Sequence, residues 1–173
     1  MWNGVGGSTN VYGAVWPRYR PSDFRKRTGH GLQPDWPIAY EDIAPFYEQA
    51  DRLLGVAGLH GALVMPPRDP CPTGPMPPSR VSRRLAGAFD QLDWHWWPVE
   101  EGTISQPYDG RPECNGCGVC NRCPRGSMSN YALSVWPRAI EAGVKARVKA
   151  RVLRVEKGAD GRVTGALYVD RDT

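Results

Sequence analysis

Long apolar runs are missing from this sequence, and so are several other signals of location and partner. No stretch approaches the roughly eighteen apolar residues that a membrane-spanning helix needs, and no charged-then-apolar leader precedes the first residues. The net charge is only +4, and the cations are scattered rather than gathered into a basic stripe interleaved with aromatics. We therefore expect no membrane span, no nucleic-acid partner and a cytoplasmic location, or a periplasmic one reached through a partner subunit.

Histidine is also scarce, which limits the candidates for proton transfer. The three histidines are His30, His60 and His95, and none has a sequence context that supplies an orienting partner. A lone histidine is more often structural or solvated than reactive. The sequence therefore nominates no catalytic residue.

Cysteine occurs in an odd number, five, which argues against a secreted disulfide scaffold. Four cysteines form one run, each two residues from the next: Cys114, Cys117, Cys120 and Cys123. Zinc ribbons usually separate their two Cys-x-x-Cys pairs widely, whereas bacterial ferredoxins use a tight run that ends in Cys-Pro. The run here also ends in Cys-Pro, with one residue fewer before the last cysteine. The spacing favours an iron–sulfur cluster, with zinc or uncomplexed thiols as alternatives, and lone Cys71 is interpreted as a bystander.

Hydrophobic periodicity predicts about three helices. Apolar residues recur at three and four positions over residues 41–54, with Pro45 placed in the first turn. A second helix is predicted over residues 81–92, with its apolar side toward the core and a serine cap near its start. A third is predicted over residues 137–142, ending at Gly143.

The remaining segments predict turns, loops and one hairpin. Alternating stretches flank Asp160-Gly161, so residues 144–170 are expected to form a β-hairpin. Prolines concentrate in an expected loop at residues 66–78, and glycines form a turn over residues 4–10 that lets backbone approach a phosphate or a ring. The expected fold class is α+β, with about three helices, a C-terminal β-hairpin and long irregular loops.

In their order along the chain, four segments resemble the glucose–methanol–choline (GMC) family of FAD-dependent oxidoreductases. They are residues 4–18, 35–42, 110–123 and 150–166. The cysteine run is similar to that of a bacterial branch of the family. The resemblance covers nearly the whole chain and implies that residues 1–173 are an internal fragment, a partial FAD-binding domain without the N-terminal Rossmann motif and the C-terminal catalytic region. The segments it implies are a flavin-contacting glycine-rich turn at 1–20, the proline-rich loop at 66–78, a cysteine-rich segment at 111–130 and the hairpin at 144–170.

The resemblance also implies which residues contact FAD. The residues implied to lie against the pyrophosphate and ribityl chain are Gly6, Gly7, Ser8 and Thr9, those implied to line the flavin are Tyr12, Gly13 and Val15, and the backbone of Val152 is implied to meet the adenine. Val11 stands where some family members carry a histidine bonded to FAD, so the FAD should be noncovalent.

By the same resemblance, the parent enzyme would oxidise an alcohol or sugar hydroxyl by hydride transfer to flavin. Some relatives of the bacterial branch pass electrons outward through a cysteine-bound iron–sulfur cluster, which implies an electron-acceptor subunit or a cytochrome as partner. This chain alone is not expected to turn over, and it should expose apolar patches. Two alternatives stay open: a small iron–sulfur or zinc-binding electron-transfer or interaction module, and an inactive truncated product.

Overall fold

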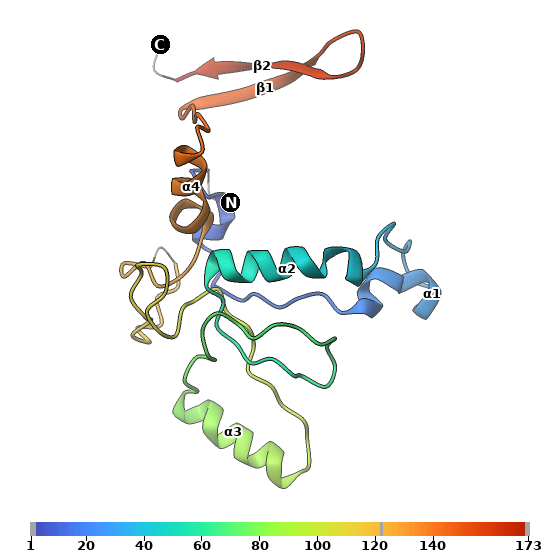
Figure 1. The fold of residues 1–173 in the computed structure, drawn as a ribbon, viewed down its shortest axis with the longest axis vertical. Coiled ribbons are helices and arrows are strands. Elements are labelled where there is room, and N and C mark those ends of the chain that lie inside the picture. The colour runs from blue at the N-terminus through green and yellow to red at the C-terminus, as the bar shows by residue number, and fades with distance from the viewer. Residues whose placement is uncertain (1–2, 122, 172–173) are drawn as a thin grey trace. The chain divides into compact units, whose positions relative to one another are not determined.

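A computed structural model describes residues 3–121 and 123–171, which combine short helices with a two-stranded sheet (Figure 1). This arrangement confirms the α+β class. Residues 1 and 2 of the predicted flavin-contacting segment, and Arg122 of the cysteine run, lie outside the described residues. The chain divides into two compact units, one ending at Arg138 and the other beginning at Ala139.

The helical elements of the described chain are mostly short. They are the 3-10 helices η1 (Gly7–Asn10) and η2 (Pro21–Arg25), the α-helices α1 (Lys26–His30), α2 (Tyr40–Leu54) and α3 (Arg80–Gln91), the π-helical segment η3 (Tyr131–Val135), and α4 (Trp136–Glu141). The strands are β1 (Ala150–Lys157) and β2 (Val163–Asp170). The sequence pattern does not predict α1, because five residues are too few to show a helical period.

Helix α2 confirms the helix predicted over residues 41–54. It begins where an Asp42 carboxylate oxygen accepts the Ala39 amide at 2.8 Å, and it ends at Gly55, whose φ is 71°. The placement of Pro45 in the first turn was wrong, because the helix begins at Tyr40 and Pro45 lies inside it. The proline ring nitrogen carries no proton, so this second-turn position lacks one backbone hydrogen bond.

Helix α3 confirms the second predicted helix but not the predicted burial of its apolar side. The Ser79 hydroxyl caps it by accepting the Ser82 amide at 3.0 Å. Val81 and Leu85 are 67% and 51% exposed, and no residue of α3 is buried within the described chain. The amphipathic pattern therefore predicted the helix correctly, whereas its expected core contact is absent among these residues.

Around the boundary between the units, α4 confirms the third predicted helix, and Gly143 follows it with a φ of 88°. The hairpin is antiparallel, with Ala150 opposite Asp170. It is shorter than predicted: the alternation over residues 144–149 forms no strand, and Lys149 has a φ of 57°, which breaks extended backbone. The turn closes where the Gly161 amide donates to the Gly158 carbonyl at 3.0 Å.

The core of the first unit is a junction of loops rather than a sheet. Ala57 and Glu101 form an isolated antiparallel bridge, in which the Ala57 amide donates to the Glu101 carbonyl at 2.8 Å. Ala14 accepts the Gly102 amide at 2.7 Å. The hydrophobic side chains buried in this unit are Ala14, Phe24, Tyr40, Leu54, Val56, Ala57, Ala62, Ile104 and Met128. This small core ties the N-terminal turn to segments about a hundred residues later.

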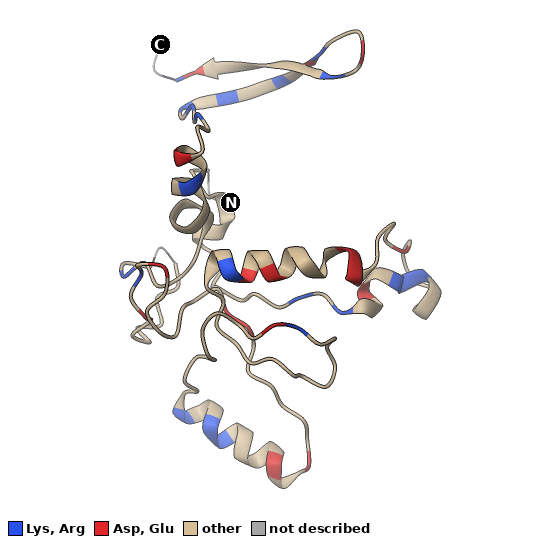
Figure 2. Cartoon of the chain, viewed as in Figure 1, with Lys and Arg blue, Asp and Glu red and all other residues tan. Residues whose placement is uncertain are grey.

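Charged residues are dispersed over the elements. In Figure 2, α3 carries its arginines at its first turns and an acidic residue near its end, and both signs also occur on α2. Among the described residues, no helix combines the length and the apolar character needed to cross a bilayer.

Candidate functional site

The glycine-rich turn adopts a backbone that few residue types tolerate. Gly6, Gly7 and Gly13 have φ values of 88°, 53° and 75°, and Ala14 follows with a φ of 68°. A non-glycine residue in this region is uncommon and costs about 1 kcal/mol or more. Such conformations persist where the surroundings fix them, and Ala14 is fully buried.

The turn is seated on the segment that follows the cysteine run. The Thr9 hydroxyl donates to the Gly6 carbonyl at 2.5 Å and accepts the Tyr131 amide at 3.1 Å. A Cβ on Gly6 would stand 3.0 Å from the Ala132 nitrogen, so only glycine fits this contact without displacement. The predicted glycine-rich turn and residues 131–132, about 120 positions later, therefore lie against each other.

Tyr12 forms a second link between the same two segments. Its hydroxyl donates to the Ser129 carbonyl at 2.9 Å. Burial, with a smaller contribution from Tyr131, raises the pKa of Tyr12 to about 12. Cys120 also contributes to that rise, which puts the cysteine run within electrostatic reach of the turn. Tyr12 is thus a neutral hydrogen-bond donor at physiological pH.

Other residues of the turn offer open surface. Apart from the glycine itself and its two chain neighbours, no described residue has an atom within 4 Å of the point where a Cβ would stand on Gly7 or Gly13. Ser8 is exposed, and Val15 is 55% exposed beside its bridge to Glu101. A ligand could reach backbone here without meeting a side chain, as a flat ring or a phosphate requires.

The cysteine run is a loop whose base is buried. At the base, the Ile104 amide donates to Ser127 at 3.1 Å, and the Cys114 amide donates to Ile104 at 2.9 Å. Ile104 and Ser127 are fully buried, whereas Cys117 is exposed and the other three cysteines are partly so. The base is further closed by Arg125, whose Nε donates to the Glu113 carbonyl at 2.7 Å. The two ends of the loop are therefore held in place by hydrogen bonds, whereas its middle, around Cys117, is exposed to solvent.

Two sulfurs of the run have shifted pKa values in opposite directions. Burial, followed by the charge of Cys114, raises the pKa of Cys120. Burial acts the same way on Cys123, but the backbone amides of residues 125–128 point at its sulfur and lower its pKa overall. Amides directed at a thiolate also suit a metal-bound sulfur.

The structure does not bring the cysteines together as a ligand set. Within residues 3–121 and 123–171, no three His, Cys, Asp or Glu side chains gather closely enough to hold a metal ion. All five cysteines are free thiols. Ligation by Cys114, Cys117, Cys120 and Cys123 stays a prediction from the sequence.

Val152, predicted to meet the adenine, lies in the other unit. It pairs with Tyr168 in the hairpin and is 55% exposed, so it is not a core residue there. The histidines are His30 at the end of α1, His60 on an exposed loop and His95, whose ring stacks on Trp97 at 6.0 Å. The nomination of no catalytic residue stays a prediction.

Sequence reasoning missed a buried ion network in the first unit. The Asp51 carboxylate pairs with the Arg18 guanidinium at 2.5 Å and with the Arg68 guanidinium at 2.6 Å, and all three side chains are less than 5% exposed. Glu48 pairs with the other terminal nitrogen of Arg18, and Glu100 pairs with the other terminal nitrogen of Arg68. Arg68 also contacts the Cys71 sulfur at 3.2 Å, and burial raises the pKa of that thiol. Cys71 is therefore part of this network rather than a loop bystander.

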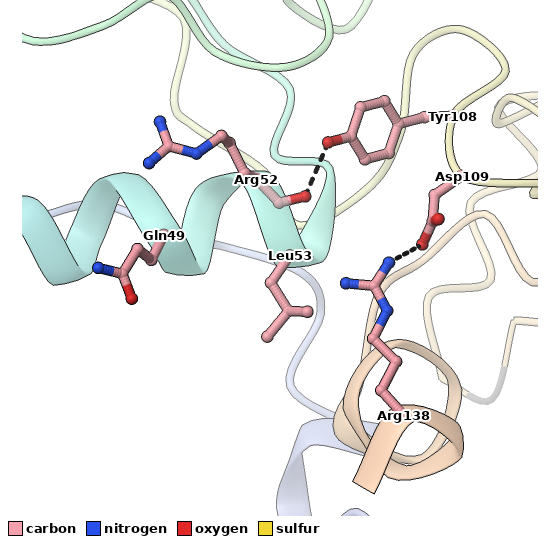
Figure 3. Close-up of a pocket in the computed structure, with 6 residues that line it drawn as sticks. All are labelled: Gln49, Arg52, Leu53, Tyr108, Asp109 and Arg138. Carbon is pink, nitrogen blue, oxygen red and sulfur yellow. Dashed lines mark hydrogen bonds and ion pairs between the residues drawn. The ribbon is translucent and has the colours of Figure 1, made fainter. Parts of the chain in front are cut away.

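An open hollow of about 640 Å³ lies between the end of α2 and the loop at Tyr108 and Asp109. Tyr108 donates to the Arg52 carbonyl at 2.8 Å, and Arg138 pairs with Asp109 at 2.7 Å. Figure 3 shows the Arg52 guanidinium pointing away from Arg138. The two cations do not converge and each has an acidic partner, so the hollow lacks the features of an anion site.

No family model matches this chain. The curated relatives to which it is similar are named as dehydrogenases or oxidases, and they are therefore oxidoreductases. It is 40% identical to a 2-methyl-1,2-propanediol dehydrogenase of Mycolicibacterium austroafricanum, over the whole chain and 32% of that protein. It is 34% identical to the fructose dehydrogenase large subunit of Gluconobacter japonicus, over 98% of the chain and 32% of the relative. It is 24% identical to the gluconate 2-dehydrogenase flavoprotein of Pantoea cypripedii, over 96% of the chain and 33% of the relative. The chain thus spans about a third of the length of the relatives it matches.

Proposed function

We propose that this chain is part of the FAD-binding region of a GMC-type dehydrogenase that oxidises an alcohol or a sugar hydroxyl. The observation that carries the proposal is the seating of the glycine-rich turn on residues 129–132, which leaves Gly7, Ser8 and Gly13 facing open space. The similarity to a diol dehydrogenase, a fructose dehydrogenase subunit and a protein named as a flavoprotein supports the same conclusion.

Residues of the turn would hold the cofactor through backbone. The left-handed Gly6 and Gly7, followed by Ser8 and Thr9, suit the pyrophosphate and ribityl chain, because amides in such a turn converge on anionic or polar oxygens. Tyr12 would keep the turn in place through Ser129, while Gly13 and Val15 offer a flat surface to the ring. Val152 would contribute its backbone to the adenine.

Flavin, when bound, supplies the hydride acceptor for oxidation of a carbinol. The part of this chain is to position that acceptor and exclude water, since the sequence nominates no base here. Val11 has no nucleophile to bond to the ring, so the cofactor would be held noncovalently. An electron-acceptor subunit is a proposed partner, supported by the relative named as a large subunit.

Iron–sulfur ligation is proposed separately from the flavin site, since the structure does not assemble the four cysteines. Iron and acid-labile sulfide, measured per flavin in the purified protein, would test it. Stoichiometric zinc without sulfide would favour the zinc alternative instead.

The flavin proposal is tested by a substitution that fills the open face of the turn. Gly7→Asn adds a side chain where no described atom lies, and asparagine tolerates a φ of 53°. In the full protein that carries this chain, we expect the variant to fold but to lose most of its acid-releasable FAD. Gly110→Asn is the matched control, because Gly110 also has a positive φ, 72°, and an open Cβ position. Equal FAD content in the two variants would contradict the proposal.

A further inference from the structure

A second cavity, of about 320 Å³, lies where α1, η2 and the first half of α2 meet. Its walls are aromatic and aliphatic, and three polar side chains stand among them. None of the residues predicted to contact FAD or metal lines it. The volume falls at the lower end of the range of about 300–1,000 Å³ that small-molecule sites occupy. The cavity therefore suits one ring rather than an extended chain.

The aromatic walls combine a buried ring with exposed ones. Phe24 is 4% exposed, whereas Tyr19 and Trp36 are 64% and 57% exposed. Tyr19 and Trp36 both stand edge-to-face with Phe24, at centroid distances of 6.5 and 6.0 Å. Tyr47 of α2 completes the aromatic lining. The exposed ring faces are free to take an apolar surface of a ligand.

The polar residues of the cavity supply both donors and acceptors. Asp23 and Lys26 form an ion pair at 2.6 Å, and the second Asp23 oxygen accepts the Arg20 amide at 2.8 Å. Gln33 lines the same cavity with a φ of 33°, a conformation that glutamine rarely adopts. The Asp23 and Lys26 charges together disfavour a ligand of either sign. A neutral ligand with several hydroxyl groups can hydrogen-bond to the Asp23–Lys26 pair and to the side-chain amide of Gln33 at once.

We propose that this cavity binds a neutral, ring-shaped polyol: a monosaccharide or a single sugar unit of a glycoside. A pyranose ring has an apolar C–H face that suits Trp36 and Tyr19, and hydroxyls that can both donate and accept. A purely aromatic ligand would use the rings but could not use the remaining hydrogen-bonding capacity of Asp23 and Lys26. None of the residues proposed to contact FAD lines this cavity, so the sugar-binding proposal and the flavin proposal rest on different residues.

The test reads binding at Trp36 itself. The full protein is labelled with 5-fluorotryptophan, and the Trp36 fluorine resonance is assigned by its loss in Trp36→Phe. Methyl β-D-glucopyranoside is then titrated, and the Trp36 resonance should shift in a saturable way. Trp94 is 61% exposed and lies outside the cavity, so its resonance, assigned through Trp94→Phe, should not shift.

A rim variant measures the hydrogen-bonding part of the proposal. Gln33→Ala should weaken glycoside binding about fivefold, as loss of one hydrogen bond does. Gln49→Ala is the matched control: Gln49 is exposed on α2 and does not line this cavity, so its replacement should leave the affinity for the glycoside unchanged. The proposal would be overturned if the Trp36 resonance did not shift with the glycoside, or if the two glutamine variants had equal effects on the affinity. It would also be overturned if 4-hydroxybenzamide bound more tightly than the glycoside. Because no step of this test depends on flavin or turnover, failure of the proposed function would leave its outcome unaffected.

Discussion

At the scale of single residues, Asp51 is the shared carboxylate of the buried ion network in the first unit. It is 2% exposed and receives two guanidinium groups, from Arg18 and Arg68. Burial alone would lower the pKa of Arg18, but its hydrogen bonds to Glu48, Asp51 and Tyr40 raise it above the ordinary arginine value. Arg18 therefore keeps its charge inside the protein, and the buried guanidinium groups of Arg18 and Arg68 share the Asp51 carboxylate as partner.

Replacing Asp51 with asparagine should be strongly destabilising. Asp51→Asn leaves two buried cations facing a neutral amide, and breaking a buried pair of this kind costs about 3–5 kcal/mol. Urea unfolding followed by circular dichroism measures the change. The matched control is Asp69→Asn, because the Arg52–Asp69 pair is more than half exposed and should contribute about 0–1 kcal/mol. Similar losses in the two variants would show that burial does not set the strength of the Asp51 pairs.

Gly102 and Tyr12 should be energetically coupled. A Cβ on Gly102 would stand 2.2 Å from the Tyr12 hydroxyl oxygen but 3.4 Å from the ring carbon that carries it. Gly102→Ala should therefore cost roughly 1–3 kcal/mol through overpacking. Tyr12→Phe loses the bond to Ser129, about 1 kcal/mol, but removes the clashing atom.

The double variant should thus be less destabilised than the sum of the two single variants, by about 1 kcal/mol in the free energy of unfolding. Gly74→Ala, which has no described atom within 4 Å of its Cβ position, should lie within about 0.5 kcal/mol of the parent. Strict additivity in the cycle would show that the Tyr12 hydroxyl moves aside freely.

At the scale of elements, the sequence predicted what depends on local chemistry. The apolar period and Gly55 predicted α2, and Asp160-Gly161 predicted the hairpin turn. The Arg18–Asp51–Arg68 network could not be predicted, because its members are 33 and 17 positions apart and carry no shared motif. The hydrogen bond from the Tyr131 amide to the Thr9 hydroxyl could not be predicted for the same reason, since a contact across 122 positions leaves no periodic signal.

Helix α3 allows its cap to be tested without interference from packing. Ser79→Ala removes the acceptor for the Ser82 amide and should lower the stability of this helix by about 1 kcal/mol. Since no residue of α3 is buried among the described residues, the loss should appear locally, as faster amide exchange over residues 82–91. Ser82→Ala keeps the capping acceptor and should leave the exchange rates nearly unchanged. A global loss of stability in Ser79→Ala would show that α3 packs against other parts of the protein.

At the scale of the whole molecule, the two units differ in how they are stabilised. The first has a buried junction of loops and an ion network. The second contains a hairpin whose large apolar residues are exposed on both faces, among them Val152, Val155 and Val163 at 52–65%. Exposed apolar surface of this kind was expected from the sequence, and it agrees with a chain that spans a third of its relatives.

The last prediction follows from that difference. A lone two-stranded hairpin is marginally stable in water, so in the 173-residue chain the amides of β1 and β2 should exchange within seconds. The amides of Ala57, Glu101 and Ile104, which bond within the buried junction, should exchange far more slowly. Hydrogen exchange with mass spectrometry on this chain and on the full protein separates the possibilities. Hairpin protection gained only in the full protein would support its burial in a larger enzyme, whereas equal, slow exchange of both units in the 173-residue chain would contradict the predicted difference between them.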